Sequence, residues 1–174
     1  MELQGKHIFL RRLTPADASD RYVSWLNDPE VNQYIESRFC PQTRESVAEF
    51  IRGVSNASNY LFGIFDGATC EHIGNIKIGN INPNHRFADV GLLIGEKSHW
   101  GKGLASEAIR LVTEFGFKNI NLNKLVAGMY DLNSGSYRAF IACGYREVGR
   151  HRQHFALGNG KYVDSILVEK LRGD

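Results

Sequence analysis

A glycine-bearing segment in the middle of the chain has the residue types of an anion-binding site. Gly101 and Gly103 stand directly before a stretch in which apolar residues recur every three or four positions from Leu104 onward, as in an amphipathic helix. Glycines at a helix start allow close backbone approach, and the free N–H groups and dipole of the first turn attract anions. The segment predicts a phosphate-binding turn, although a turn without any ligand fits the local pattern equally well.

Two familiar nucleotide-binding patterns do not fit this segment. The dinucleotide fingerprint places G-x-G-x-x-G in the first strand-helix unit, whereas here two glycines near the middle of the chain follow Trp100. The pattern G-x-x-x-x-G-K-[ST] is absent from the sequence. A phosphate bound at this turn would therefore belong to another kind of site.

Other residues with acid-base or metal-binding chemistry are scattered along the chain. The acid-base candidates are Glu36, Glu71, His72, His85 and Asp89. His151 and His154 lie three positions apart on an expected strand, so they are predicted to face opposite sides and not to share a metal ion. The three cysteines, Cys40, Cys70 and Cys143, have no paired spacing, so neither a zinc site nor a disulfide framework is predicted.

Bulk composition excludes several function classes. The chain has 174 residues, and 21 basic against 19 acidic residues give a net charge of +2, which is no electrostatic footprint for nucleic acid or an anionic membrane. The N-terminus lacks the layout of a signal peptide, and no apolar run approaches the ~20 residues that span a bilayer. We expect a cytoplasmic protein with one domain over 1–174.

Apolar periodicity predicts the elements that position these residues. The expected strands are 7–13, 60–65, 71–81, Phe87–Ile94, 124–130, 146–157 and 161–171, with a polar break at 55–59. The expected helices begin at Pro15, Pro29, after Thr43, near Gly103 and at Asn133. The order of these elements predicts a mixed α/β fold, with a sheet of about seven strands and helices on both faces.

The order of elements, together with three sequence patches, resembles the GNAT superfamily of acyl-CoA-dependent N-acetyltransferases over essentially the whole chain. The nearest branch is that of the ribosomal-protein N-terminal alanine acetyltransferases. The patches are 88–95 with 100–105, 133–136 with 143–145, and 159–164. The superfamily loop pattern Gln/Arg-x-x-Gly-x-Gly/Ala corresponds to Trp100-x-x-Gly103-x-Ala105, in which Trp100 departs from the usual residue.

The resemblance implies that acetyl-CoA lies in a wedge where the fourth and fifth strands splay apart. The pantetheine arm would pair with strand backbone as an added strand does, and the pyrophosphate would bind the glycine turn. The implied cofactor-binding residues are Leu92, Leu93, Ile94, His99, Trp100, Gly101, Lys102, Gly103, Leu104, Ala105 and Asn133.

Direct acetyl transfer from a thioester to an amine needs a base, a donor for the carbonyl oxygen and an acid for the departing thiolate. The resemblance implies a backbone N–H near Leu93 or Ile94 as the donor. Many members carry a tyrosine acid at the position of Phe140, which has no proton to give, and in the alanine branch Ser136 corresponds to the acid. Asp89 is the candidate base. Asn133 and Ser136 could equally be helix caps, and Asp89 could instead orient a substrate ammonium.

The resemblance therefore implies an N-acetyltransferase that moves acetyl to a primary amine in a ternary complex, and homodimers are common in such families. The acceptor could be a protein N-terminus, a small amine or an amino-sugar nucleotide. Because Phe140 replaces the tyrosine, a non-catalytic acyl-CoA-binding regulatory domain is an alternative, and a nucleotide-binding dehydrogenase is another. Trp25, Tyr34 and Phe39 could wall the acceptor pocket; of these, Trp25 is predicted to be core and Tyr34 to face the pocket.

Overall fold

The computed structural model describes residues 1–56 and 59–174, and these form one eight-stranded mixed sheet with four α-helices. Along the sheet the strands have the order β1-β2-β3-β4-β5-β6-β8-β7. Neighbouring strands are antiparallel except for β5 and β6, which run parallel. The strands are β1 (Glu2–Gln4), β2 (Ile8–Arg12), β3 (Tyr60–Asp66), β4 (His72–Asn82), β5 (Phe87–Ile94), β6 (Lys124–Tyr130), β7 (Arg146–Gly158) and β8 (Lys161–Leu171).

The mixed α/β fold is confirmed, with one more strand than the expected seven. The extra strand is β1, which pairs with β2 at the sheet edge through Leu3 and its two neighbours. Three residues are too short to show an alternating pattern, so sequence periodicity missed it. The expected fourth and fifth strands are accordingly β5 and β6.

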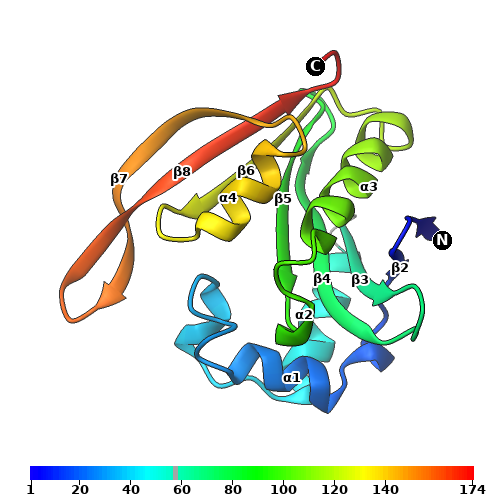
Figure 1. Cartoon of the computed structure of the whole chain (residues 1–174), viewed down its shortest axis with the longest axis vertical. Helices are drawn as coiled ribbons and strands as arrows, with labels where there is room; N and C mark the ends of the chain where they lie inside the picture. Colours follow the sequence, from blue (N-terminus) through cyan, green and yellow to red (C-terminus); the bar gives the residue numbers. More distant parts are fainter. Residues whose placement is uncertain (57–58) are drawn as a thin grey trace.

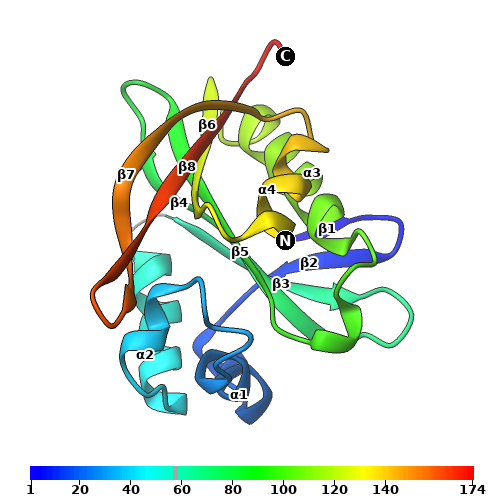
Figure 2. The same cartoon turned by 60° about the vertical axis from the view of Figure 1, so that its left-hand side comes forward.

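The helices cover both faces of the sheet (Figures 1 and 2), as expected. Helices α3 (Leu104–Lys118) and α4 (Ser134–Ile141) pack on one face, where Phe62 and Ile64 of β3 join their core. Helices α1 (Asp20–Asn27) and α2 (Arg44–Asn56) pack on the other face, against Leu61. Since successive strand residues point to opposite faces, β3 contributes to both cores. Among the described residues, no helix is long and apolar enough to cross a bilayer.

Of the two helices predicted early in the chain, the one through Trp25 forms but begins later than expected, and the one at Pro29 does not form. The Pro15 signal produces only a single 3-10 turn, η1 (Pro15–Asp17), and α1 begins later, where Ser19 Oγ accepts the Tyr22 N–H at 3.2 Å.

After Asp28 the chain makes turns instead of a helix. The Asp28 carboxylate accepts the Glu30 N–H at 2.9 Å as a helix cap does, and the Asn32 N–H bonds the Asp28 carbonyl at 2.8 Å, but the backbone is extended again at Ile35, with φ of −129° and ψ of 152°. A short 3-10 segment, η2 (Glu36–Phe39), follows.

The remaining signals are confirmed at the described positions. Thr43 accepts the Ser46 N–H before α2, and Gly144 ends α4 with φ of +82°. The polar break expected at 55–59 includes residues 57 and 58, which lie outside the described residues. Strand β8 pairs with β6 from Ser165 to Leu171, and the tip of the β7–β8 hairpin projects beyond the rest of the sheet (Figure 1).

Candidate active site

Strands β5 and β6 diverge at the centre of the sheet. Their parallel pairing covers only Phe87–Asp89 on β5, opposite Lys124–Val126 on β6, although β5 continues to Ile94 and β6 to Tyr130. From Val90 onward the edge of β5 that faces β6 therefore has no strand partner, whereas its other edge stays paired with β4. Backbone N–H and C=O groups on such an edge need partners, and an extended ligand with amide groups supplies them.

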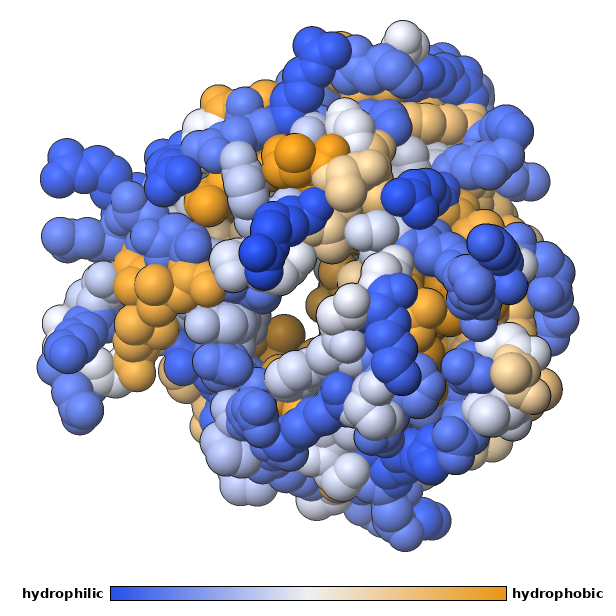
Figure 3. Space-filling model, viewed as in Figure 1, coloured by the Kyte–Doolittle hydropathy of each residue, from blue (hydrophilic) through white to orange (hydrophobic). Residues whose placement is uncertain are grey.

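A cavity of about 600 Å³ opens at this divergence. Figure 3 shows the hollow near the centre of the molecule, in the region where Figure 1 has α4, β5 and the segment before α2. Its walls come from β4, β5, β6 and α4, and from α1, α2 and the segment between them. The cavity thus joins the open edge of β5 to the α1/α2 side of the sheet.

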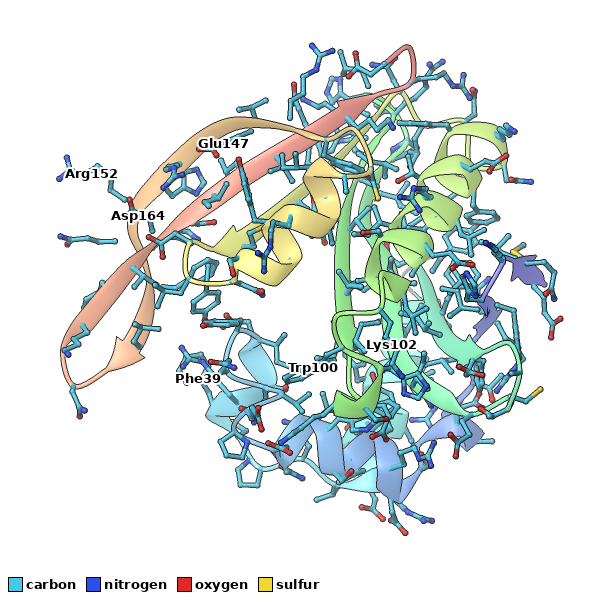
Figure 4. The ribbon with its side chains drawn as sticks, in the orientation of Figure 1. Phe39, Trp100, Lys102, Glu147, Arg152 and Asp164 are labelled. Atoms are coloured by element: carbon cyan, nitrogen blue, oxygen red, sulfur yellow. The ribbon has the colours of Figure 1, made fainter. Side chains whose placement is uncertain are left out.

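The glycine turn adjoins the end of β5 and fits an anionic group. Gly101 and Gly103 have φ of +72° and +78°, a left-handed conformation that favours glycine, and a Cβ at either would meet nothing within 4 Å. Gly103 is the N-cap of α3 without a side-chain cap bond, so the first-turn N–H groups are left for a ligand. Lys102 stands between the glycines (Figure 4) and adds a positive charge.

The rest of the loop is held by side chains. The Trp100 indole donates to the Ile94 carbonyl oxygen at 2.8 Å and ties the turn to the end of β5. His99 Nε2 lies 3.4 Å from Asp66 Oδ2, so its imidazole faces the β3–β4 connection. Leu104 is buried in the core, so its side chain stabilises the fold while its backbone starts α3.

Asn133 and Ser136 both line the cavity at the start of α4. The Asn133 Oδ1 accepts the Ser136 N–H at 3.1 Å, so Asn133 caps the helix. Phe140 also lines the cavity and is buried edge-on against Tyr145, with ring centroids 5.0 Å apart. The Tyr145 hydroxyl is paired with Thr113 at 2.9 Å, and burial raises its pKa. Ser136 is thus the hydroxyl that this helix presents to the cavity.

Asp89 lies at the closed end of the divergence and does not line the cavity. It is paired with Gly79 of β4 and Val126 of β6, and its Oδ2 accepts a hydrogen bond from Asn80 Nδ2 at 2.6 Å. Its side chain shares a sheet face with Gly91, which does line the cavity. The structure therefore separates the two predicted catalytic residues, Asp89 and Ser136, by element and by position.

The wall opposite the sheet comes from the segment between α1 and α2. Tyr34 and Glu36 line the cavity, as was predicted for Tyr34. The Tyr130 ring lies 5.4 Å from Tyr34 between centroids, and its hydroxyl donates to Glu36 Oε1 at 3.5 Å while accepting from Arg38 Nη2 at 3.2 Å. Trp25 is buried core, as predicted, and Phe39 is 60% exposed (Figure 4) and not part of the cavity wall.

Two polar residues of the cavity floor were missed by the sequence analysis. Asn75 and Lys77 reach it from alternate positions of β4. Asn75 is only 5% exposed, and it interrupts a strand whose buried positions Ile73, Ile76 and Ile78 are apolar. A buried amide in such a strand was the available signal. Among the residues described as lining the cavity, Glu36 and Lys77 are the charged ones.

The other acid-base candidates lie elsewhere. Glu71 pairs with Arg21 at 3.1 Å on the surface, and His85 stacks on Phe87. His72 is buried 5.0 Å from the Trp25 ring, and burial lowers its pKa.

The prediction that His151 and His154 face opposite sides was wrong. Their rings lie 5.0 Å apart, because the β7–β8 register shifts between His151 and Phe155, where Gln153 has φ of +48°. Within the described ranges, no cluster of three or more histidine, cysteine, aspartate or glutamate side chains could hold a metal ion. The three cysteines are free thiols.

Comparison with known proteins gives the family. Residues 7–146 match the model of the acetyltransferase (GNAT) domain. The chain is 28% identical over 175 residues to an uncharacterized N-acetyltransferase, p20, from Bacillus licheniformis, covering 98% of this chain and 96% of that protein.

Solved structures agree in fold. Mycobacterium smegmatis RimJ in complex with CoA-disulfide superimposes with a TM-score of 0.85 at 18% identity, over 99% of this chain and 88% of that one. Spermidine N-acetyltransferase from Vibrio cholerae in complex with CoA and spermine gives 0.83 at 24% identity, over 96% of each chain. The family match over most of the chain, on a fold whose β5 edge and glycine turn suit CoA, shows that the chain belongs to the GNAT family of acetyl-CoA-dependent N-acetyltransferases.

Proposed function

We propose that the protein transfers acetyl from acetyl-CoA to the primary amine of a small molecule or a protein N-terminus, directly and within a ternary complex. The observation that carries this proposal is that one cavity connects the open edge of β5 to the α1/α2 side of the sheet. Thioester and amine can therefore meet without leaving the cavity.

A covalent acetyl-enzyme has less support. Among the described residues, none of the three cysteines lines the cavity. Cys143 is buried with its thiol directed at the Ser106 carbonyl at 3.2 Å, and burial raises the pKa of that thiol, so little thiolate forms. Direct attack by the amine fits these residues better.

The donor half of the proposal assigns one group of acetyl-CoA to each feature. The turn of Gly101 and Gly103, with the first N–H groups of α3, would hold the pyrophosphate. Backbone groups alternate sides along a strand, and the Gly95 N–H bonds Ile73 of β4, so the Leu93 backbone also faces β4. The backbone of Val90 and Leu92, on the open edge, would pair with the pantetheine amides.

The Ile94 carbonyl oxygen already accepts a hydrogen bond from the Trp100 indole. The Ile94 N–H is therefore the backbone group of this residue that a ligand could bind. The remaining Asn133 amide N–H₂ group is placed to donate to the arm.

For the chemistry, we assign the acid to Ser136 and the base to Asp89. The amine nitrogen attacks the thioester carbon, the Ile94 N–H on the open edge of β5 stabilises the oxygen as it gains charge, and the C–S bond breaks. The ammonium first loses one proton to Asp89 through water; after the attack the thiolate takes a proton from Ser136, which lines the cavity, and the second proton from the nitrogen passes through water to restore Ser136. Glu36 on the opposite wall would hold the acceptor ammonium before it loses its proton.

The proposed mechanism is tested by incubating the protein with acetyl-CoA and a panel of amines while following free thiol. The panel contains an N-terminal alanine peptide, spermidine, amino acids and amino sugars. Thiol release that depends on one class of amine supports the proposal and names the class. Tight CoA binding without thiol release on any amine would favour a non-catalytic acyl-CoA-binding domain, for which Phe140 is the motivating residue. Tighter binding of NADH than of CoA would contradict the donor assignment.

A further inference from the structure

Two hydrogen-bond donors stand on the floor of the cavity, on the acceptor side. Asn75 and Lys77 are two positions apart on β4, so their side chains leave the same face of the sheet about 7 Å apart. Opposite them on β5 lie Leu93 and Gly91. Because Gly91 has no side chain, the space above this part of the floor is left open.

The orientation of the Asn75 amide follows from its neighbour. His72 Nε2 lies 3.0 Å from the Gly74 carbonyl oxygen and 2.9 Å from Asn75 Oδ1. A carbonyl oxygen only accepts, so Nε2 carries the hydrogen, and the Asn75 oxygen is the atom that faces it. The Asn75 N–H₂ group is therefore the free end of the amide. Among the described residues it has no hydrogen-bond partner, although Asn75 is 95% buried and lines the cavity.

Lys77 supplies a positive charge on the same face of β4 as this donor. Its stem lies over Gly79, and its ammonium is 6.0 Å from the centre of the Phe50 ring. Within the part of the chain that the structure describes, no carboxylate lies within 4.0 Å of it. An ammonium at the wall of a largely apolar cavity attracts an anion. The floor thus offers an amide donor at Asn75 and, further along the same face of β4, an ammonium on a flexible four-carbon stem that can turn toward the same anion.

We infer that the acceptor carries an anionic group, a carboxylate or a phosphate, besides its amine, and that Lys77 and Asn75 bind this group. This inference rests on the proposed function and narrows its substrate class. Glu36 stands on the facing wall, so the two charged residues of the cavity match the two ends of an acceptor that bears an amine and an anion. The same arrangement disfavours polyamines, since Lys77 repels a second cationic group.

The test compares acceptors in matched pairs that differ in the anionic group alone. The carboxylate pair is β-alanine and β-alaninamide, and the phosphate pair is glucosamine 6-phosphate and glucosamine. Rates are expressed per free-base amine, because the two amines of a pair differ in pKa. In the wild-type protein we expect kcat/KM to be about 30-fold higher for the anionic member of at least one pair, mainly through KM. The pair that shows it identifies the source of the anion.

Variants of Lys77 and Asn75 test whether these residues cause the preference for the anionic acceptor. Lys77→Met should reduce it to threefold or less, Lys77→Arg should retain most of it, and Asn75→Asp should weaken it by placing a carboxylate beside the anion. Lys118→Met is the matched control, because it removes one positive charge at the far end of α3, where Lys118 pairs with Glu114. An unchanged CoA affinity and melting temperature verify that each variant is folded.

Binding is measured in parallel, so that the inference is decided even without turnover. Each compound is titrated into the CoA complex by calorimetry. Binding of an anionic member that depends on Lys77, with no thiol release on any amine, would support the anion site and count against the proposed function. Equal binding and equal rates for both members of each pair, or a preference that survives Lys77→Met, would overturn the inference.

Discussion

The donor side of the cavity is formed mainly by backbone groups, and the acceptor side by side chains. On the donor side, the groups that suit acetyl-CoA are mainly backbone: the open edge of β5, the left-handed turn at Gly101 and Gly103, and the uncapped start of α3. On the acceptor side they are side chains from distant elements, such as Glu36 before α2 and Lys77 on β4. The donor half therefore depends on local conformation and the acceptor half on tertiary assembly.

This difference explains why a chain can keep its donor while its acceptor changes. A backbone site constrains only the few positions where glycine or a helix start is required. A wall of side chains can be replaced residue by residue without disturbing the sheet. The related structures, with spermine in one case and CoA-disulfide in another, share the fold at low identity.

The largest expected effect breaks the donor half. Gly103→Val places a β-branched residue at φ of +78° and shifts the start of α3. The first N–H groups of α3 then no longer point at the pyrophosphate. We expect the Kd for CoA to rise about 1000-fold, measured by calorimetry. Gly160→Val is the control, because Gly160 has φ of +72° in the distant hairpin turn. A comparable loss in both variants would mean that general strain, and not the turn, governs binding.

The next largest effect is on kcat and concerns Ser136, between the donor and acceptor sides of the cavity. Ser136→Ala should lower kcat about 100-fold with the Kd for CoA changed by less than twofold, because it removes a proton donor and leaves the Asn133 cap intact. Single-turnover acetyl transfer gives both values. Ser134→Ala in the same helical turn is the exposed counterpart and should keep full activity. Full activity in Ser136→Ala would assign the proton to water or another group.

Two carboxylates can be told apart by their kinetic signatures. Asp89→Asn can still accept the Asn80 hydrogen bond but cannot take a proton, so kcat should fall about 50-fold while the acceptor KM changes little. Glu36→Gln should raise the acceptor KM about tenfold and change kcat little, as expected for a residue that holds an ammonium. Interchanged signatures would reverse the two assignments.

The smallest effect is on the pH dependence of the free energy of unfolding, through His72 on the acceptor side. Burial lowers the pKa of His72 from its ordinary value of 6.5, so folding favours the neutral ring that donates to Asn75. That stabilisation is present above pH 6.5 and is lost as the pH falls, since the unfolded chain then binds the proton first. Between pH 7.5 and 5.5 the unfolding free energy of wild type should drop more than that of His72→Gln, by up to about 1 kcal/mol in urea titrations. Equal drops would show that His72 does not titrate differently in the fold.

The elements of the donor half could be predicted from the sequence for a physical reason. A strand, a glycine turn and an amphipathic helix are local patterns, so the residues from Phe87 through Leu104 carry their own signal. The fold followed from the same periodicities, and β1 was missed because three residues show none.

The acceptor half carried no comparable signal. Asn75 and Lys77 are ordinary strand positions until the fold brings them and α2 to the same cavity. The helix signal at Asp28 fails because the backbone becomes extended at Ile35, which the local pattern does not show. The His151 and His154 rings meet because of a register shift that strand alternation cannot anticipate.

The central claim is that the open edge of β5 and the glycine turn bind the donor while the far side of the same cavity receives the amine. A crystal structure with acetyl-CoA tests it most directly. We predict the pantetheine alongside Val90–Ile94, the pyrophosphate on the N–H groups at Gly101 to Ala105, and the thioester facing the cavity near Ser136. Acetyl-CoA bound instead in the basic groove of Arg110, Lys170 and Arg172, on the other side of α3, would contradict the account.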